Sequence, residues 1–570
     1  MKDSPYAGPL FTSRAFMAAL VVVGGLSLFC VTRKLSARPG YESSLILSPF
    51  IALMAGIAAI GIVRKMGLGQ AGAFQRAPVS AALSCALLTA LCLVLLAAGG
   101  VLRGLCDFSD GLAFFMIGPL CCAAAASCIG FMIAAVFGRA AAAYGTWALV
   151  VLGSLFVDFL EFYATPKVNV YDHLLGYFAG PLWDEAVRVD SRLWLFRGIT
   201  FSVLACAMLF FFTGFDRGSV SFSLKRALSS WRGRFSALLL AAVIAGCCLV
   251  QAHAGISGSR RHIESRLAQV VQAGDTLIFL PSHVSGREAA WLRQDVMFRE
   301  WQLTKFFGER PRGVMRLYFF ESADMMKKYT GAGPTSVSKP WLGEAYMVYR
   351  RPPHGPIKHE LAHLYSALWG SGPLRLAGKL WGMASNPVLI EGTAVAADWD
   401  GDPAAPHAAC AAGMRAGLLK TWDPFSSRGF FDVSSGLSYE ASGSFVRFVR
   451  DTWGTGALAK WYGGMDFEDA AGVSEKQAAA KWRAFITGMD VAPQLVSDVK
   501  RRYAAPSIFD RTCPHAVANL YERAGQCEGR GDIGGGLDAF SRIEHLDGKN
   551  RVHALSRARF ITGACMATGS

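Results

Sequence analysis

The sequence contains no run of lysine and arginine interleaved with aromatic residues, and no nucleotide-binding G-x-x-x-x-G-K-[ST] loop. The first absence argues against a nucleic-acid partner, even though Lys and Arg outnumber Asp and Glu by 57 to 42. The second gives no support to a nucleotide-driven transporter. Charged residues of either sign are also scarce in residues 1–256, which hold 19 Lys and Arg and 11 Asp and Glu. So few charges over so long a segment indicate a membrane region rather than a soluble domain.

Long apolar runs fill that same segment. The whole chain has a mean hydropathy of +0.32 and is 52% apolar, which is high for a soluble protein of 570 residues. A membrane-spanning helix needs about 20 mostly apolar residues. Seven stretches qualify: 14–32, 44–63, 78–101, 111–137, 142–163, 197–214 and 235–253. The first is expected to be retained rather than cleaved as a secretory signal, because no small-residue cleavage site follows it.

Basic residues between the sixth and seventh stretches predict the orientation. That loop carries five of them: Arg217, Lys225, Arg226, Arg232 and Arg234. The positive-inside rule places it in the cytoplasm, so the part of the chain after residue 256 is expected outside. We therefore expect an integral protein of a bacterial inner or cell membrane with a periplasmic C-terminal domain. The first loop, with Arg33, Lys34 and Arg38, falls on the outer side and does not follow the rule.

The chain after residue 256 has the mixed composition of a soluble α+β domain. Helices are expected at 260–271, 287–308, 324–329, 356–369 and 438–454, and strands at 275–281, 313–322 and 343–350. We expect this domain to span 257–500, after the membrane region at 1–256. The last segment, 501–570, predicts two helices joined at Gly531-Asp532 and resembles a single tetratricopeptide unit.

Cysteine is concentrated in the membrane region, where ten of the 14 residues are expected to be small apolar packing residues. The outer part of the chain contains Cys410, Cys513, Cys527 and Cys565. In an oxidising compartment two of these four are expected to pair, and the sequence does not say which two.

The stretch "PIKHELAHLYSALWG", residues 356–370, carries the most specific chemical motif of the chain. The i, i+4 spacing of His359 and His363 places both imidazoles on one helix face, as two adjacent corners of a zinc tetrahedron require. Glu360 would stand beside the metal, where it can take a proton from a water molecule. The alternative is a surface helix with two solvated histidines.

The stretch "NPVLIEGTAVAAD" offers a third ligand, since catalytic zinc sites usually have three protein ligands. Glu391 follows three apolar residues on a helix that Asn386 caps and Pro387 begins. A carboxylate among so many apolar residues is costly unless it is paired or bound to a metal. Gly392 is expected to allow close approach to the first helix. The alternative is a partly exposed helical glutamate.

The segments "HELAH" and "IEGTA" together resemble the gluzincin zinc peptidases of the MA clan, and most of all the peptidase MA-like domains of bacterial envelope proteins. The resemblance covers about residues 265–485. It implies a thermolysin-like fold, Zn²⁺ bound by His359, His363 and Glu391, and Glu360 as general base. It also implies that "GEAYMVYR", residues 343–350, is the edge strand along which a peptide or protein substrate lies.

Two features depart from the better-known gluzincins. The Gly- and Met-containing aminopeptidase motif before the zinc helix is absent, and Val395 stands where thermolysin-type enzymes have an aspartate. Asp398, on the same helix face, is a candidate to orient a zinc-binding histidine.

An oxyanion formed during peptide hydrolysis needs a hydrogen-bond donor in addition to a metal. Tyr439 is the first candidate and His354 the second. A packing role for Tyr439 and a solvated loop position for His354 are the alternatives.

These observations favour a membrane-anchored zinc metallopeptidase. A zinc-binding or sensing protein without turnover is a second interpretation, and a transporter with an accessory outer domain is a third. Substrate identity and oligomeric state are not predicted by the sequence.

Overall fold

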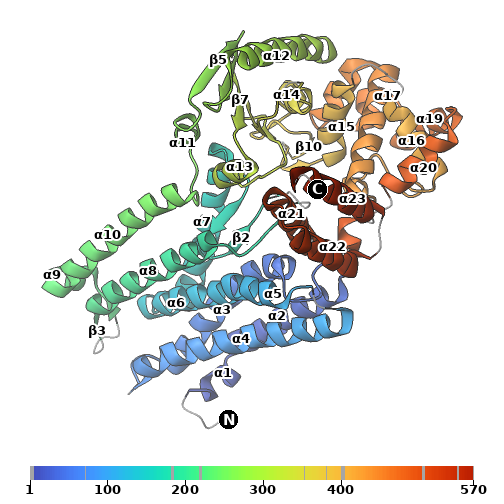
Figure 1. Cartoon of the computed structure of the whole chain (residues 1–570). Coiled ribbons are helices and arrows are strands. Elements are labelled where there is room, and N and C mark those ends of the chain that lie inside the picture. The colour runs from blue at the N-terminus through green and yellow to red at the C-terminus, as the bar shows by residue number, and fades with distance from the viewer. Residues whose placement is uncertain are drawn as a thin grey trace. The chain divides into compact units, whose positions relative to one another are not determined.

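The computed structural model of the chain divides into two compact units (Figure 1). Unit 1 consists of the residues up to 258 together with 512–522, and unit 2 of 259–511 together with 523–570. The segment from 501, predicted as a separate helical part, is thus shared between them. The structure describes residues 6–70, 72–104, 106–180, 185–216, 221–351, 353–380, 382–399, 405–503, 507–511, 513–548 and 551–568.

Unit 1 is a bundle of apolar helices, as expected from the sequence. Among the described residues, seven helices or joined helices are long and apolar enough to cross a membrane. They are α2 (Arg14–Thr32), α3 (Tyr41–Met66), α4 (Ala73–Arg103), α5 to α6 (Phe108–Val136), α7 (Ala140–Ala164), α8 (Ser191–Gly214) and α10 (Trp231–Ala254). Large apolar side chains on α7 and α10 are exposed, which suits helices that face lipid. The seven predicted stretches are all helical.

Shorter elements connect these helices. They are α1 (Gly8–Thr12), the hairpin β1 (Val170–Asp172) and β2 (Gly176–Phe178), the hairpin β3 (Phe215–Asp216) and β4 (Ser221–Phe222), and α9 (Leu224–Ser229). Between α5 (Phe108–Phe115) and α6 (Cys121–Val136) lies one π-helical turn, Met116–Leu120. Pro119 within it lacks a backbone N–H, which is a common cause of such a local change of hydrogen bonding.

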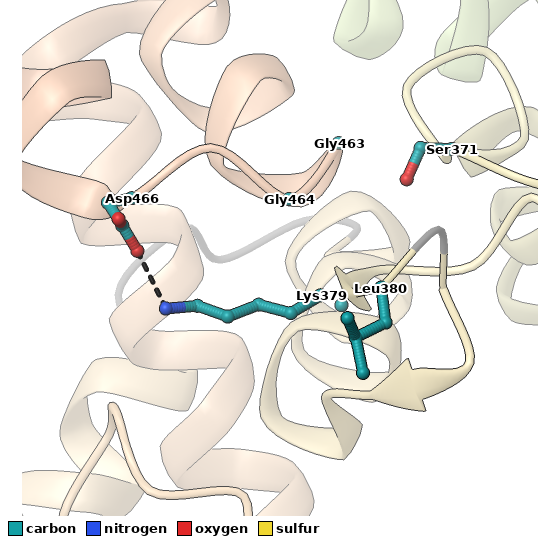
Figure 2. Close-up of a pocket in the computed structure, with 7 residues that line it drawn as sticks. Ser371, Lys379, Leu380, Gly463, Gly464 and Asp466 are labelled. Carbon is teal, nitrogen blue, oxygen red and sulfur yellow. Dashed lines mark hydrogen bonds and ion pairs between the residues drawn. The ribbon is translucent and has the colours of Figure 1, made fainter.

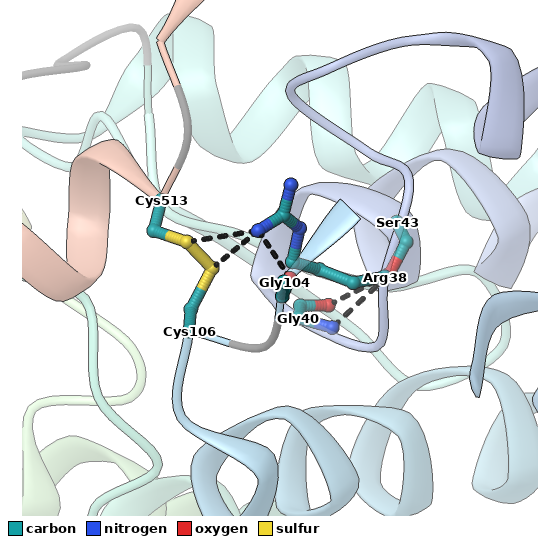
Figure 3. The surroundings of a disulfide bond; sticks show 6 residues. All are labelled: Arg38, Gly40, Ser43, Gly104, Cys106 and Cys513. Carbon is teal, nitrogen blue, oxygen red and sulfur yellow. Dashed lines mark hydrogen bonds between the residues drawn. A yellow bond between two sulfur atoms is a disulfide. The ribbon is translucent and has the colours of Figure 1, made fainter. Parts of the chain in front are cut away.

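A disulfide joins the loop after α4 to a residue near the end of the chain (Figure 3). It links Cys106 to Cys513, which are 407 residues apart in sequence. The buried guanidinium of Arg38 lies against this bond, with Nη1 donating to the carbonyl oxygen of Gly104 at 2.6 Å. The same nitrogen is 3.4 and 3.5 Å from the two sulfur atoms. We call Arg38, Gly104, Cys106 and Cys513 the disulfide cluster.

Residues 513–522 pack on the bundle beyond the disulfide. His515 Nδ1 lies 2.8 Å from the carbonyl oxygen of Glu185, and Asn519 Nδ2 donates to Val187 at 3.0 Å. The His515 ring meets Tyr41 edge to face at 5.0 Å. This part of the C-terminal segment is therefore structurally part of unit 1.

The expected pairing among the four outer cysteines is wrong. Cys513 pairs with Cys106, which the sequence suggested as a packing residue. Cys410 and Cys527 are buried free thiols. The side chain of Cys565 lies outside the described residues. Composition alone cannot reveal a bond whose partners are 407 residues apart in the sequence.

Unit 2 contains a five-stranded mixed sheet in the order β5-β6-β7-β9-β8. The strands are β5 (Gln269–Ala273), β6 (Thr276–Leu280), β7 (Met315–Phe320), β8 (Val337–Lys339) and β9 (Glu344–Val348). The three central strands are parallel, and β5 and β8 are antiparallel to their neighbours. Phe279, Tyr318 and Tyr346 are in register across them and stack at 4.7 and 5.3 Å between ring centroids.

Two expectations about these strands are wrong. The stretch 343–350 is not at the sheet edge, because β8 pairs with β9 on its outer side. The stretch 260–271 is helical only in α11 (Arg260–Glu264), and its second half turns into β5. The alternation of exposed and buried residues along β5 is short, so the preceding helical pattern masks it.

Helices cover this sheet and form the rest of unit 2. They are α12 (Gly286–Phe307), α13 (Ala323–Thr330), α14 (Ile357–Ser366), α15 (Pro387–Asp398), α16 (Ala405–Arg415), α17 (Ser435–Tyr462), α18 (Phe467–Ala471), α19 (Glu475–Gly488), α20 (Pro493–Arg502), α22 (Ile533–Asp547) and α23 (Arg551–Thr568). Helix α21 (Pro514–Arg530) is divided between the units, and Gly531 and Asp532 connect it to α22 as predicted. A small hairpin, β10 (Gly378–Lys379) and β11 (Ala384–Ser385), lies between α14 and α15.

Local sequence signals account for several helix ends. Ser285 and Glu288 form a capping box at the start of α12, and Gly308, at φ 91°, ends it. Helix α17 is broken at Gly454, at φ 86°, where the sequence predicts a helix end. Both glycines adopt a backbone conformation that other residues rarely tolerate.

Gly392 allows close packing, but not against the helix that the sequence suggested. A Cβ atom there would lie 2.7 Å from the carbonyl oxygen of Ser442 and 2.8 Å from Val446, both on α17. The glycine therefore brings α15 close to α17 instead of α14.

Candidate metal centre

Helix α14 presents two histidines on one face because its other face is anchored in the core. Ile357, Leu361 and Leu364 are buried in the main apolar cluster of unit 2. Tyr365 also fixes the helix to α12, by donating its hydroxyl to the carbonyl oxygen of Glu300 at 3.2 Å. With that face buried, His359 and His363 project from the neighbouring face, one turn apart.

Helix α15 brings Glu391 to the same point. Asn386 caps this helix by accepting a hydrogen bond from the Leu389 backbone N–H at 3.3 Å, as the sequence predicts. The Oε2 atom of Glu391 lies 3.5 Å from His359 Nε2 and 3.4 Å from His363 Nε2. The two Nε2 atoms are 3.2 Å apart. We call His359, His363 and Glu391 the metal triad.

These three distances fit a bound zinc ion. Zinc–ligand bonds of about 2.0–2.1 Å in a tetrahedron place neighbouring ligand atoms about 3.3–3.4 Å apart. The observed N–O distances of 3.4 and 3.5 Å are also longer than ordinary N–H···O hydrogen bonds. Among the residues that the structure describes, no other group of His, Cys, Asp or Glu converges in this way. The three side chains are 10 to 23% exposed, so the space between their ligand atoms can be reached from solvent.

The charges within the triad favour its ionised state. Burial lowers the pKa of His359, but the nearby carboxylate of Glu391 and the charges of Glu360 and Asp398 together raise it to about 9. Burial raises the pKa of Glu391, but His363 and His359 outweigh it and hold that pKa well below its usual range. The carboxylate is thus kept charged, as a metal ligand must be.

Glu360 is held by a residue that the sequence did not suggest. Ser338, on the edge strand β8, donates its hydroxyl to Glu360 Oε2 at 2.8 Å. The same hydroxyl lies 3.1 Å from the Glu360 carbonyl oxygen. Glu360 is buried, so this contact ties the expected general base to the edge of the sheet. A three-residue strand gives no periodic signal from which Ser338 could have been found.

The remaining predicted residues separate into two groups. The Tyr439 ring, on α17, lies 6.3 Å from the His359 ring between centroids, beside the metal triad. Asp398 is near enough for its charge to raise the pKa of His359. His354 is not at the site, because its buried ring packs against Phe319 and its Nε2 lies 2.9 Å from the Val348 carbonyl oxygen.

A separate cavity of about 320 Å³ lies in unit 2 near the hairpin that follows α14 (Figure 2). It is lined by Ser371, Gly378, Lys379, Leu380, Gly463, Gly464 and Asp466. Lys379 and Asp466 form an exposed ion pair of 2.7 Å across it. None of the metal triad lines this cavity, and we assign it no role.

Comparison with known proteins adds no assignment, because no protein-family model and no curated protein matches this sequence.

Proposed function

We propose that this chain is a membrane-anchored zinc metallopeptidase of gluzincin type, and that the metal triad holds its zinc. The observation that carries the proposal is the convergence of three ligand atoms at 3.2 to 3.5 Å from two different helices. Seven apolar helices supply the anchor. The buried carboxylate of Glu360, next in sequence to a ligand, supports hydrolysis over zinc storage or sensing, since a purely structural site needs no such group.

The residues around the triad have distinct roles in this proposal. Zinc bound there would supply a Lewis acid that lowers the pKa of a bound water and polarises the scissile carbonyl. Glu360 accepts the proton of the attacking water and returns it to the leaving amine nitrogen. Tyr439 donates its phenolic hydrogen to the developing oxyanion. Asp398 orients His359.

Strand β8 is the surface on which we place the substrate backbone. It is the last strand of the sheet and carries Ser338, which contacts the general base. An extended peptide can add to such an edge through main-chain hydrogen bonds. This replaces 343–350 as the expected substrate strand.

The disulfide supports an extracytoplasmic site for the peptidase. Disulfides persist in oxidising compartments and are rare in the cytosol. If all seven apolar helices span, the four from Phe108 to Ala254 are an even number between Cys106 and the start of unit 2, which supports placing both on one side of the membrane. The disulfide cluster also gives Arg38 a structural role, which accounts for a basic residue in the outer loop.

The zinc content of the full-length chain in detergent, measured together with two isosteric variants, tests the proposal. We expect one zinc per chain, most of it lost in Glu391→Gln and all of it kept in Glu360→Gln. The second variant is the matched control, because it removes a neighbouring carboxylate that is not a ligand. Absence of zinc in the folded wild-type chain would reduce the triad to an ion-pair cluster and overturn the proposal.

A further inference from the structure

Helix α12 is apolar on two sides, and only one of them is buried. Leu292, Val296 and Leu303 are fully enclosed in the core of unit 2. On the opposite side Trp291, Phe298 and Trp301 are 61, 52 and 53% exposed. Large aromatic side chains gathered on a solvent-facing surface indicate an interaction site. We call these three residues the aromatic stripe.

The spacing of the stripe makes it one continuous surface. Its members recur at seven and three residues, so they lie along one line of the helix. The Phe298 and Trp301 rings stack at 5.8 Å between centroids. Arg287 and Lys305, both exposed, extend the same line at its two ends.

The exposed charges of α12 are all positive. Arg287, Arg293 and Lys305 are exposed, and no carboxylate is found among the exposed residues of the helix. Its three acidic residues are engaged within the fold: Glu288 with the Ser285 cap, Asp295 with Arg299 and Glu300 with Arg310. Lys305 Nζ lies 3.6 Å from the centroid of the Trp301 ring, so cation and aromatic share one surface.

We propose that the aromatic stripe binds the headgroup region of an anionic lipid bilayer. Tryptophan and phenylalanine flanked by lysine and arginine form the composition of helices that lie in the membrane interface. The cations complement anionic headgroups. This inference does not depend on whether the metal triad is catalytic.

The short link between α10 and unit 2 favours a lipid bilayer as the partner of the aromatic stripe. Helix α10 ends at Ala254 and unit 2 begins at 259, so a membrane surface is always close to the domain. A tethered domain needs only weak intrinsic affinity to occupy a surface, because the tether sets a high effective concentration.

A second copy of the chain fits the stripe less well. Pairing two α12 helices places cations opposite one another in either direction: Arg287 meets Arg287 in a parallel pair and Lys305 in an antiparallel pair. Like charges held together in an interface oppose association.

Photo-crosslinking of the full-length chain in nanodiscs tests the proposal. The discs contain phosphatidylcholine with or without phosphatidylglycerol, and a phospholipid that carries a diazirine near its headgroup. We expect lipid adducts on peptides from 286–307 in the anionic discs. Replacing all three aromatic residues with serine should reduce those adducts roughly fivefold or more. Adducts on the membrane spans are the internal control and should not change.

Two further variants make the test specific. Arg287→Gln with Lys305→Gln should remove the difference between anionic and neutral discs, and it keeps the test informative if the triple variant does not fold. Gln294→Ser, on the same line of the helix, is the matched control and should behave as wild type. The proposal would be overturned if lipid adducts were found only on the spans. It would also be overturned if the adducts on 286–307 were unchanged in the triple variant. Cross-links between α12 helices of two chains would do the same, in favour of a dimer.

Discussion

In unit 1 the buried guanidinium of Arg38 bonds to a backbone carbonyl and lies against the Cys106–Cys513 sulfurs, whereas in unit 2 the metal triad turns its ligand atoms toward one another. Both clusters contain polar groups largely withdrawn from water. In the disulfide cluster Arg38 Nη1 donates to the carbonyl oxygen of Gly104 and lies against both sulfur atoms, while the buried Nε of the same side chain has no hydrogen-bond partner among the described residues. In the metal triad two imidazole nitrogens meet at 3.2 Å beside a carboxylate, which suits a shared cation better than direct bonding.

This difference separates a structural cluster from a candidate site. Groups that satisfy one another stabilise the fold, so their removal should lower stability and leave zinc binding intact. Groups that converge on one point should affect the metal and its chemistry, with the fold preserved.

The largest effect is expected for Glu360→Gln, a change next to the metal triad. Loss of the proposed general base should reduce kcat for peptide hydrolysis by about 10³-fold, with zinc content and unfolding temperature unchanged. Hydrolysis of a mixed set of quenched fluorescent peptides measures it. Glu468→Gln, an exposed glutamate on α18, is the control and should retain full activity. A fully active Glu360→Gln variant would remove Glu360 from the mechanism.

Removing the disulfide bond of the disulfide cluster should give the next largest effect. Cys106→Ser with Cys513→Ser should destabilise unit 1 by about 2–4 kcal/mol and leave zinc content unchanged. The thermal unfolding midpoint in detergent reports the first quantity and metal analysis the second. Cys248→Ser, an exposed free cysteine, is the control. Loss of zinc in the double variant would show that the two clusters are not independent.

Ser338→Ala should have a smaller effect, because Ser338 acts through Glu360. We expect kcat to fall about tenfold with little change in KM, the cost of one hydrogen bond to a charged group. Ser338→Thr keeps the hydroxyl and should restore most of the activity. Equal rates for the alanine and wild-type chains would limit Ser338 to a packing role.

The smallest effect is a pH dependence confined to the metal-free chain. Because the pKa of His359 is raised to about 9, its stabilising contribution is complete below about pH 6.5 and is lost as the pH rises toward 9. Glu391, with a lowered pKa, stays ionised throughout this window. We expect the unfolding midpoint after chelation to decline from pH 6.5 to 9, equivalent to about 1–2 kcal/mol. Zinc should abolish the decline, and a slope that persists with zinc would assign it to other groups.

The sequence predicted most of the features that depend on local pattern. All seven apolar stretches are helices, and the Asn386 cap and the helix end at Gly308 are where the sequence predicts them. The metal triad was also predictable, because two of its members are one helical turn apart and the third lies in a conspicuously apolar stretch. The structure shows that these three residues converge; their metal binding and catalytic use stay predictions.

Features that depend on long-range contacts were missed. Strand β8 is three residues long and becomes a strand only by pairing with β9, so neither the true sheet edge nor Ser338 was visible. The same holds for the partner of Gly392 and for the position of His354, which the packing of α17 and β7 decides. Cys106 is the membrane-region cysteine that lies outside the seven apolar stretches, but its partner is 407 residues away and no local pattern pointed to it.

The Cys106–Cys513 bond also turns most of the polypeptide into a covalent ring. The ring runs from Cys106 to Cys513, so it includes the last four apolar helices and the part of unit 2 before α21, and leaves out the first three apolar helices. A single protease cut anywhere within it would leave the two fragments joined, and they would separate on a gel only after reduction. One such nick, whether between two of these apolar helices or in unit 2, would therefore not separate unit 2 from the apolar helices.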